Sequence, residues 1–148
     1  MQRQAKHIML AEDDEDDSQF FEEALKYIAD PPNLVIAKDG VELTDFLQNS
    51  ETLPDVVFLD LNMPRKNGAQ CLTEIRGREE FQHLPVVVLS TSNAADIIEK
   101  MYEFGANLYV QKPTDMQSWG KAIARILGMD WNIQRPFSVK KNFILTEF

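Results

Sequence analysis

The chain has 148 residues, of which 44% are hydrophobic and 26% charged, a balance that is typical of one folded domain. Its 24 acidic and 15 basic side chains give a formal net charge of −9, which disfavours nonspecific binding to nucleic acid. The single cysteine excludes an internal disulfide, and no apolar run approaches the roughly 20 residues that a membrane-spanning helix needs.

Two units of strand then helix are predicted in the first third of the chain. Residues 7–11 form an apolar run that ends abruptly in acids, which is typical of a strand buried on both faces. Residues 18–29 repeat apolar side chains at three- and four-residue steps, which predicts a helix that two prolines end. Residues 34–37 predict a second strand, and residues 41–47 a second helix after an Asp-Gly turn.

Three further units follow. Residues 55–61 are the clearest central strand, because they are rich in β-branched and aromatic side chains and lack polar alternation. The remaining expected elements are a helix over 69–76, a strand over 86–89, a helix capped by Asn93 and ended by Gly105, a strand over 108–111, and a helix from Asp115 to Leu127. Such alternation predicts an α/β fold, a doubly wound (βα)5 unit whose parallel sheet carries helices on both faces.

Reactive side chains follow four of the five expected strands. In an open parallel sheet the functional crevice lies outside the carboxyl ends of the strands. The side chains at these ends are Glu12 and Asp13, Asp60, Ser90, and Lys112. Taken singly, the acids after the first strand could be loop residues, Ser90 a helix cap and Lys112 a surface cation. Asp60 differs, because an unpaired carboxylate at the end of an apolar strand is costly. Asp60 therefore needs a cation beside it.

These residue types together fit one chemistry. Clustered carboxylates repel unless a hard divalent ion neutralises them, and oxygen ligands suit Mg²⁺, with Mn²⁺ as a substitute. Beside such an ion Asp60 can attack phosphorus, while Lys112 and the Ser90 hydroxyl bind the phosphoryl oxygens. We therefore predict a phosphoacceptor site.

The absent motifs narrow the alternatives. The chain has no Gly-rich phosphate loop, no Gly-x-Gly-x-x-Gly after its first strand and no Gly-x-Ser-x-Gly elbow, which disfavours nucleotide binding and serine hydrolysis. His7 and His83 lack the spacing of a zinc site, and Cys71 fits a packing role within a helix. The N-terminal residues lack the apolar stretch of a signal peptide, so we expect a cytoplasmic protein.

Four motifs, in this order, resemble the receiver domains of two-component response regulators. They are Ile-Met-Leu-Ala-Glu-Asp-Asp at 8–14, Pro-Asp-Val-Val-Phe-Leu-Asp-Leu-Asn-Met-Pro at 54–64, Leu-Pro-Val-Val-Val-Leu-Ser-Thr at 84–91, and Ala-Asn-Leu-Tyr-Val-Gln-Lys-Pro at 106–113. Residues 60–68 are similar to the single-domain regulators paired with phytochrome-type histidine kinases. The resemblance spans residues 7–128 and implies a flavodoxin-like sheet of five strands in the order 2-1-3-4-5.

The resemblance also implies a role for each matched residue. Asp60 would be the phosphoacceptor, and the metal ligands would be Glu12, Asp13, Asp60 and the backbone carbonyl of Asn62, with Asp14 just outside. The other implied roles are the switch hydroxyl for Ser90, the rotating aromatic for Tyr109, catalysis for Lys112, a cis peptide between Lys112 and Pro113, and tuning of dephosphorylation for Asn62 and Ser92. A sensor histidine kinase or a histidine phosphotransfer protein would supply the phosphoryl group.

Two other functions are compatible with such a fold, a phosphatase and a degenerate receiver. A phosphatase that forms an aspartyl phosphate usually has a cap insertion and a second acid two residues after its nucleophile, where this chain has Asn62. A degenerate receiver that only binds partners would normally have lost an acid or the lysine. We expect a switch that catalyses its own phosphorylation and dephosphorylation, without independent substrate turnover.

Composition changes after Met129, so we expect a receiver domain over 1–129 and a tail over 130–148 that is no separate domain. The tail is rich in apolar side chains: Phe137, Val139, Phe143, Ile144, Leu145 and Phe148. It would pack onto the domain or add an edge strand to a second copy, in preference to disorder. A homodimer could also form through the fourth helix, fifth strand and fifth helix. We expect no nucleic acid or membrane partner.

Overall fold

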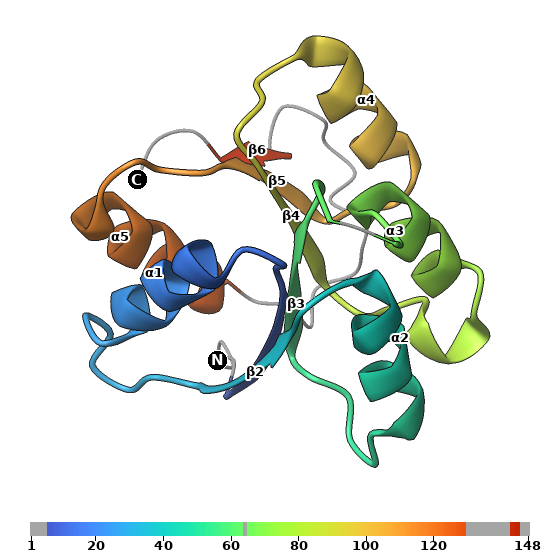
Figure 1. Ribbon diagram of the computed structural model, residues 1–148, viewed down its shortest axis with the longest axis horizontal. Helices are drawn as coiled ribbons and strands as arrows, with labels where there is room; N and C mark the ends of the chain where they lie inside the picture. The colour runs from blue at the N-terminus through green and yellow to red at the C-terminus, as the bar shows by residue number, and fades with distance from the viewer. Residues whose placement is uncertain (1–5, 64, 130–142, 146–148) are drawn as a thin grey trace.

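The computed structural model describes residues 6–63, 65–129 and 143–145, which surround a parallel β-sheet (Figure 1). The strands are β1 (His7–Ala11), β2 (Asn33–Ala37), β3 (Val56–Asp60), β4 (Val86–Ser90), β5 (Leu108–Gln111) and β6 (Ile144–Leu145). Their order in the sheet is β2-β1-β3-β4-β5-β6, and all neighbours pair in parallel. The predicted order of the first five strands is confirmed, and β6 extends the sheet beyond β5.

The helices form two layers. They are α1 (Glu15–Leu25), α2 (Gly40–Asn49), α3 (Gly68–Arg76), α4 (Ala95–Glu103) and α5 (Met116–Leu127), with a 3₁₀ turn over Glu79–Phe81. Helices α1 and α5 cover one face of the sheet, and α2, α3 and α4 cover the other (Figure 1). No helix among the described residues has both the length and the apolar character that crossing a membrane requires.

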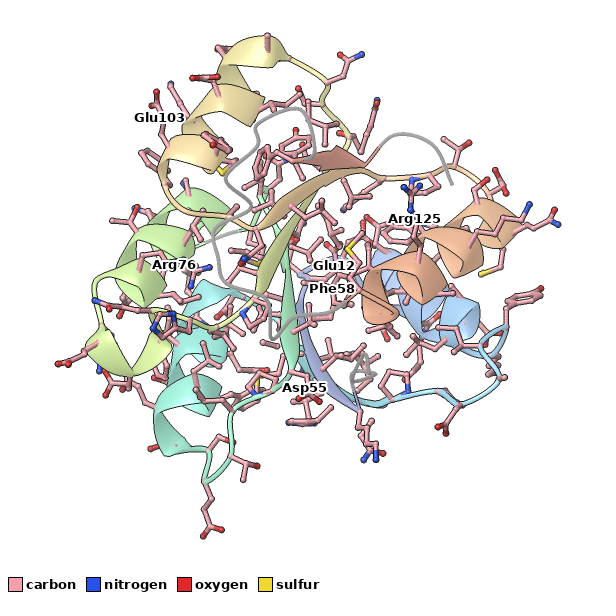
Figure 2. All side chains as sticks on the ribbon, turned by 180° about the vertical axis from the view of Figure 1, so that it is seen from behind. Glu12, Asp55, Phe58, Arg76, Glu103 and Arg125 are labelled. Carbon is pink, nitrogen blue, oxygen red and sulfur yellow. The ribbon has the colours of Figure 1, made fainter. Side chains whose placement is uncertain are left out.

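The core has one half on each face of the sheet, and β3 contributes to both. All five residues of β3 are buried, and alternate side chains belong to opposite halves of the core. On the α1 and α5 side, the ring of Phe21 lies 5.0 Å from that of Phe58 and 5.6 Å from that of Trp119. Phe58 accordingly lies near the middle of the molecule in Figure 2. This double burial explains why the strand shows no polar alternation.

Both ends of α1 and the beginning of α4 differ from the sequence prediction. Helix α1 begins at Glu15 instead of residue 18, because the Asp14 side chain accepts hydrogen bonds from the backbone N–H groups of Asp16 and Asp17. It ends at Leu25. From residue 26 to residue 28 the backbone N–H groups donate to the carbonyl three residues earlier instead of four. The prediction that Asn93 caps α4 is wrong. The cap residue is Ala94, and the Ser92 hydroxyl accepts its N–H at 3.0 Å.

The described part of the tail lies along β5. The backbone N–H of Tyr109 donates to the carbonyl of Phe143 at 2.8 Å, and Ile144 pairs with Tyr109 in the sheet. Phe143 is 1% exposed, and its ring centroid lies 5.2 Å from that of Tyr102 and 6.4 Å from that of Tyr109. Phe143 thus belongs to the core of the domain. The tail residues Phe137, Val139 and Phe148 lie outside the described residues.

Candidate functional site

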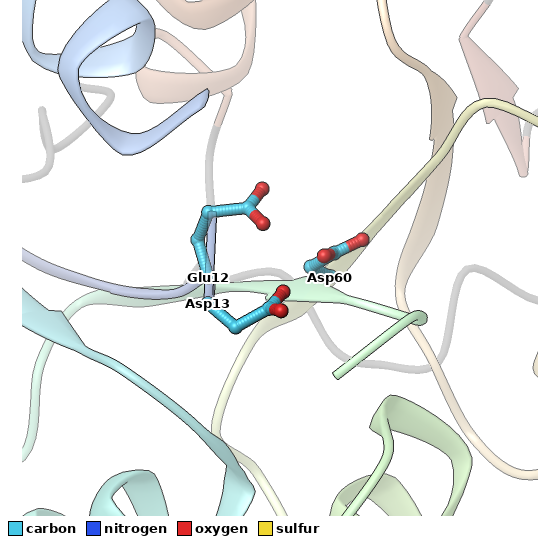
Figure 3. A group of neighbouring side chains, drawn as sticks. All are labelled: Glu12, Asp13 and Asp60. Carbon is cyan, nitrogen blue, oxygen red and sulfur yellow. The ribbon is translucent and has the colours of Figure 1, made fainter. Parts of the chain in front are cut away.

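Three carboxylates meet at the carboxyl end of the sheet. Glu12 and Asp13 follow β1 directly, and Asp60 is the last residue of the neighbouring strand β3. Each offers an oxygen within 4.8 Å of the others, and Figure 3 shows the three side chains turned toward a common space. Glu12 and Asp60 are buried, whereas Asp13 is exposed. The group opens to solvent on the Asp13 side.

The loop after Asp60 turns back tightly against the site. The N–H of Gly68 donates to the carbonyl of Leu61 at 3.2 Å, and a Cβ at position 68 would lie 2.6 Å from the carbonyl oxygen of Asp60. Only glycine fits there, because any side chain would collide with the backbone of the acceptor residue. This close approach lets α3 begin directly beneath the site.

Lys112 joins the carboxylates from β5. Its ammonium lies 3.0 Å from Glu12 Oε1 and 3.3 Å from Asp60 Oδ1. The backbone N–H of Lys112 donates to the carbonyl of Ser90 at 2.8 Å, which fixes the end of β5 against the end of β4. The structure therefore brings together, at one edge of the sheet, the strand ends that carry the predicted residues Glu12, Asp13, Asp60, Ser90 and Lys112.

Charge is unevenly distributed in this group. Burial, and after it the adjacent Asp60 carboxyl, raises the pKa of Glu12 to about 8, although Lys112 opposes the shift. Burial would lower the pKa of Lys112, but the charges of Glu12 and Asp60 outweigh burial and raise it. Three carboxyl groups, those of Glu12, Asp13 and Asp60, therefore lie beside a single ammonium, that of Lys112. An all-oxygen group with excess negative charge fits a hard divalent cation.

Ser90 and Tyr109 are linked through Ser92. Ser90 is 2% exposed, and its hydroxyl accepts the N–H of Ser92 at 3.1 Å. Tyr109 is fully buried, and its hydroxyl donates to the carbonyl of Ser92 at 2.7 Å. Both side chains thus contact the same backbone segment, between β4 and α4. Asn62 is exposed beside Asp60, and its N–H lies 3.4 Å from Asp60 Oδ1.

One contact of the site was missed in the sequence. Asp17 lies in the first turn of α1, and its Oδ2 atom accepts from the Lys112 ammonium at 3.3 Å. The available signal was spacing, because Asp17 stands four residues before the buried Phe21 and therefore on the same helical face.

The other candidate residues have structural roles. Asp14 caps α1 and stands outside the three-carboxylate group. Cys71 is buried in α3, and burial raises the pKa of its thiol to about 11. Such a thiol is unreactive near neutral pH. Asp39 caps α2 through the N–H of Glu42 and pairs with Arg65.

Comparisons with known proteins agree with this geometry. The family model described as response regulator receiver domain matches residues 8–124. The response regulator Rcp1 of Synechocystis sp. is 34% identical over 126 residues, which cover 82% of this chain and 86% of that protein. The phosphorylated cyanobacterial phytochrome response regulator RcpA has a similar crystal structure, with a TM-score of 0.77 and 30% identity over 92% of this chain and 100% of that one. The Mn²⁺-bound form of response regulator Rcp1 gives a TM-score of 0.73 and 30% identity over 88% and 98%.

Proposed function

The chain belongs to the response regulator receiver domain family, and on that premise we propose that it is a phosphoacceptor switch whose acceptor is Asp60. The observation that carries the proposal is the gathering of the Glu12, Asp13 and Asp60 oxygens within 4.8 Å, with the Lys112 ammonium 3.3 Å from Asp60. A site with a nucleophile, a metal-ligand set and a fixed cation is what phosphoryl transfer to a carboxylate requires.

Glu12, Asp13, Asp60 and the backbone carbonyl of Asn62 would hold the metal, Mg²⁺ or Mn²⁺ in its place. The donor set supports this, since every side chain in the group offers oxygen and the group carries excess negative charge. The similar protein Rcp1 was crystallised in a Mn²⁺-bound form. A bound dication would neutralise the carboxylates and stabilise negative charge on the phosphoryl oxygens.

The chain's own residues perform the transfer. A carboxylate oxygen of Asp60 attacks the phosphorus of a phosphohistidine, the P–N bond breaks as the O–P bond forms, and the leaving imidazole takes up a proton. Lys112 is held beside Asp60 and donates an N–H to a phosphoryl oxygen. The Ser90 hydroxyl donates another. Asn62 and Ser92 flank the product and set how readily water reaches it.

Contacts around Ser92 connect the acceptor to the surface. Ser90 accepts the N–H of Ser92, and Tyr109 donates to the carbonyl of the same residue. When the Ser90 hydroxyl turns toward a phosphoryl group, this backbone segment shifts and the hydrogen bond that holds Tyr109 changes with it. The surface of α4, β5 and α5 would then report the phosphorylated state to a partner or a second copy.

The phosphoryl donor would be a sensor histidine kinase or a histidine phosphotransfer protein in the cytoplasm. The similar RcpA is a phytochrome response regulator, which favours a phytochrome-type kinase. We place the receiver domain at residues 1–129 and the tail at residues 130–148. The burial of Phe143 in the core supports a tail that is no separate domain. The cis peptide between Lys112 and Pro113 stays a prediction.

Labelling with a small acyl phosphate in the presence of Mg²⁺ tests the function. Wild-type protein is expected to take up one phosphoryl group per chain and then lose it, whereas Asp60→Asn is expected to take up none. Asp30→Asn is the matched control. Asp30 is an exposed acid between α1 and β2, so this variant should label normally. Steady release of phosphate from a stable phosphomonoester, which an autocatalytic switch does not use as a donor, would indicate a phosphatase. Absence of any labelling would indicate a binding module.

A further inference from the structure

Lys112 has three carboxyl partners, and they are not equivalent. Its ammonium lies 3.0 Å from Glu12, 3.3 Å from Asp60 and 3.3 Å from Asp17. Glu12 and Asp60 belong to the carboxylate group that fits a metal, whereas Asp17 stands outside that group. Oxygens of the first two would be shared with an ion. Asp17 alone keeps its charge for Lys112.

The backbone of Asp17 is held in place. Its N–H donates to the Asp14 side chain at 3.2 Å, which fixes the first turn of α1. The helix itself is anchored by Phe21, which packs against Phe58 and Trp119. The Asp17 carboxylate therefore reaches Lys112 from a rigid element and not from a mobile loop.

Lys112 also has room to leave the site. A cavity of about 280 Å³ lies beside its side chain, between α1 and the start of α5. Asp17 and Lys112 line it, together with the apolar side chains of Phe20, Phe21 and Trp119. A flexible four-carbon side chain next to open space loses its position easily unless something holds its charged end.

We propose that Asp17 is a positioning residue that keeps the Lys112 ammonium beside Asp60 when Glu12 and Asp60 are engaged by a metal ion. The inference rests on the proposed function and assigns to α1 a part in it. The Asp17 side chain is 52% exposed, so the interaction is a modest one. Its effect is on the geometry of Lys112 and not on the acceptor itself.

The affinity for beryllofluoride, a mimic of the phosphoryl group, measures this effect without chemistry. At saturating Mg²⁺, Asp17→Asn is expected to bind beryllofluoride about twofold to fivefold more weakly than wild type. The matched control is Asp16→Asn, which removes the same charge from an exposed neighbour in the same turn. Removing a negative charge should by itself favour an anionic ligand, so the control is expected to bind equally or slightly more tightly.

Two more readouts separate positioning from a general structural effect. Asp17→Glu restores the charge and is expected to recover most of the affinity. In the Mg²⁺-saturated protein, the ¹H–¹⁵N signal of the Lys112 ammonium is expected to broaden in Asp17→Asn and not in Asp16→Asn. The broadening should be smaller in the metal-free protein, where Glu12 and Asp60 also hold the ammonium. The affinity for Mg²⁺ is expected to change less than the affinity for beryllofluoride. Equal behaviour of Asp17→Asn and Asp16→Asn would overturn the positioning role alone. If wild type neither binds beryllofluoride nor accepts label, the proposed function itself fails.

Discussion

Glu12 is the residue of the site whose charge the fold supports least. It is 5% exposed and lies in the same group of oxygens as Asp60. Burial, and then the contact with Asp60, raises its pKa from 4.5 to about 8, although Lys112 opposes the shift. Between these two values the folded protein holds a proton that the unfolded chain has released.

The metal-free protein is therefore expected to lose stability as the pH rises. The contribution of Glu12 is present in full below about pH 4.5 and is lost as the pH passes about 8, because the folded state binds more protons than the unfolded state in that window. Urea unfolding in the presence of a chelator, at several pH values across the window, measures the free energy of unfolding. In Glu12→Gln the side chain cannot titrate, so a pH dependence as steep as that of wild type would contradict this assignment.

Five residues of the site can be predicted from the sequence, and a sixth, Asp17, cannot, for a physical reason. Glu12, Asp60 and Lys112 follow directly from the rule that parallel strands end at one edge. Asp17 depends on where α1 begins. With a start at residue 18, Asp17 belongs to a loop and has no defined direction. The Asp14 cap moves the start to Glu15 and turns Asp17 toward Lys112.

At the scale of elements, Arg76 and Asn107 join α3 to the beginnings of β4 and β5. Arg76 ends α3, and its guanidinium donates to the Gly105 carbonyl and to Asn107 Oδ1, each at 2.9 Å. The same oxygen of Asn107 accepts the N–H of Val86 at 2.7 Å. Asn107 is fully buried. One amide oxygen therefore holds a helix end and two strand starts in register.

Replacement of Asn107 by alanine should be destabilising, because it leaves the buried Val86 N–H and the partly buried Arg76 guanidinium without this acceptor. We expect Asn107→Ala to lower the free energy of unfolding by about 2–4 kcal/mol. Urea denaturation would measure the loss, with Asn49→Ala at the exposed end of α2 as a control that changes little. Asn107→Asp keeps the acceptor oxygen and should lose less. An Asn107→Ala protein as stable as the control would show that water or neighbouring groups replace the amide.

Helix caps show how far sequence predicts the elements. The Asp115 cap was predicted, and its side chain accepts the N–H of Ser118 at 2.8 Å. Asn93 is an equally suitable cap by residue type, but Ser92 supplies the hydrogen bond to Ala94 instead. Ser92 is held by its own contacts to Ser90 and Tyr109. Tertiary contacts of Ser92 therefore fix where α4 begins, which local cap preference cannot predict.

At the scale of the whole molecule, the C-terminal strand β6 covers the edge of β5. Without β6 the strand β5 would present an unpaired edge, which invites pairing with another chain. The backbone carbonyl of Phe143 accepts the N–H of Tyr109, and its ring packs against the rings of Tyr102 and Tyr109. The sequence showed an apolar tail but not its docking place, because contacts between distant segments leave no local periodicity.

Phe143 should therefore matter more than its place near the end of the sequence suggests. We expect Phe143→Ala to lower the free energy of unfolding by about 3–4 kcal/mol, because a fully buried ring is removed from between two others. Ile144→Ala is the matched control, since that neighbour is 39% exposed and should lose far less.

The same substitution tests whether the tail limits the switch. Tyr109 is fully buried and its ring lies 6.4 Å from that of Phe143, so we expect Phe143 to hinder an outward turn of the Tyr109 ring. Phe143→Ala is expected to speed flipping of the Tyr109 ring and to allow self-association at the exposed β5 edge, as ring NMR signals and sedimentation would report. If Phe143→Ala and Ile144→Ala behave alike in stability, ring motion and mass, the docking of this segment in solution is contradicted, and the β5 edge is open to partners in the unphosphorylated state.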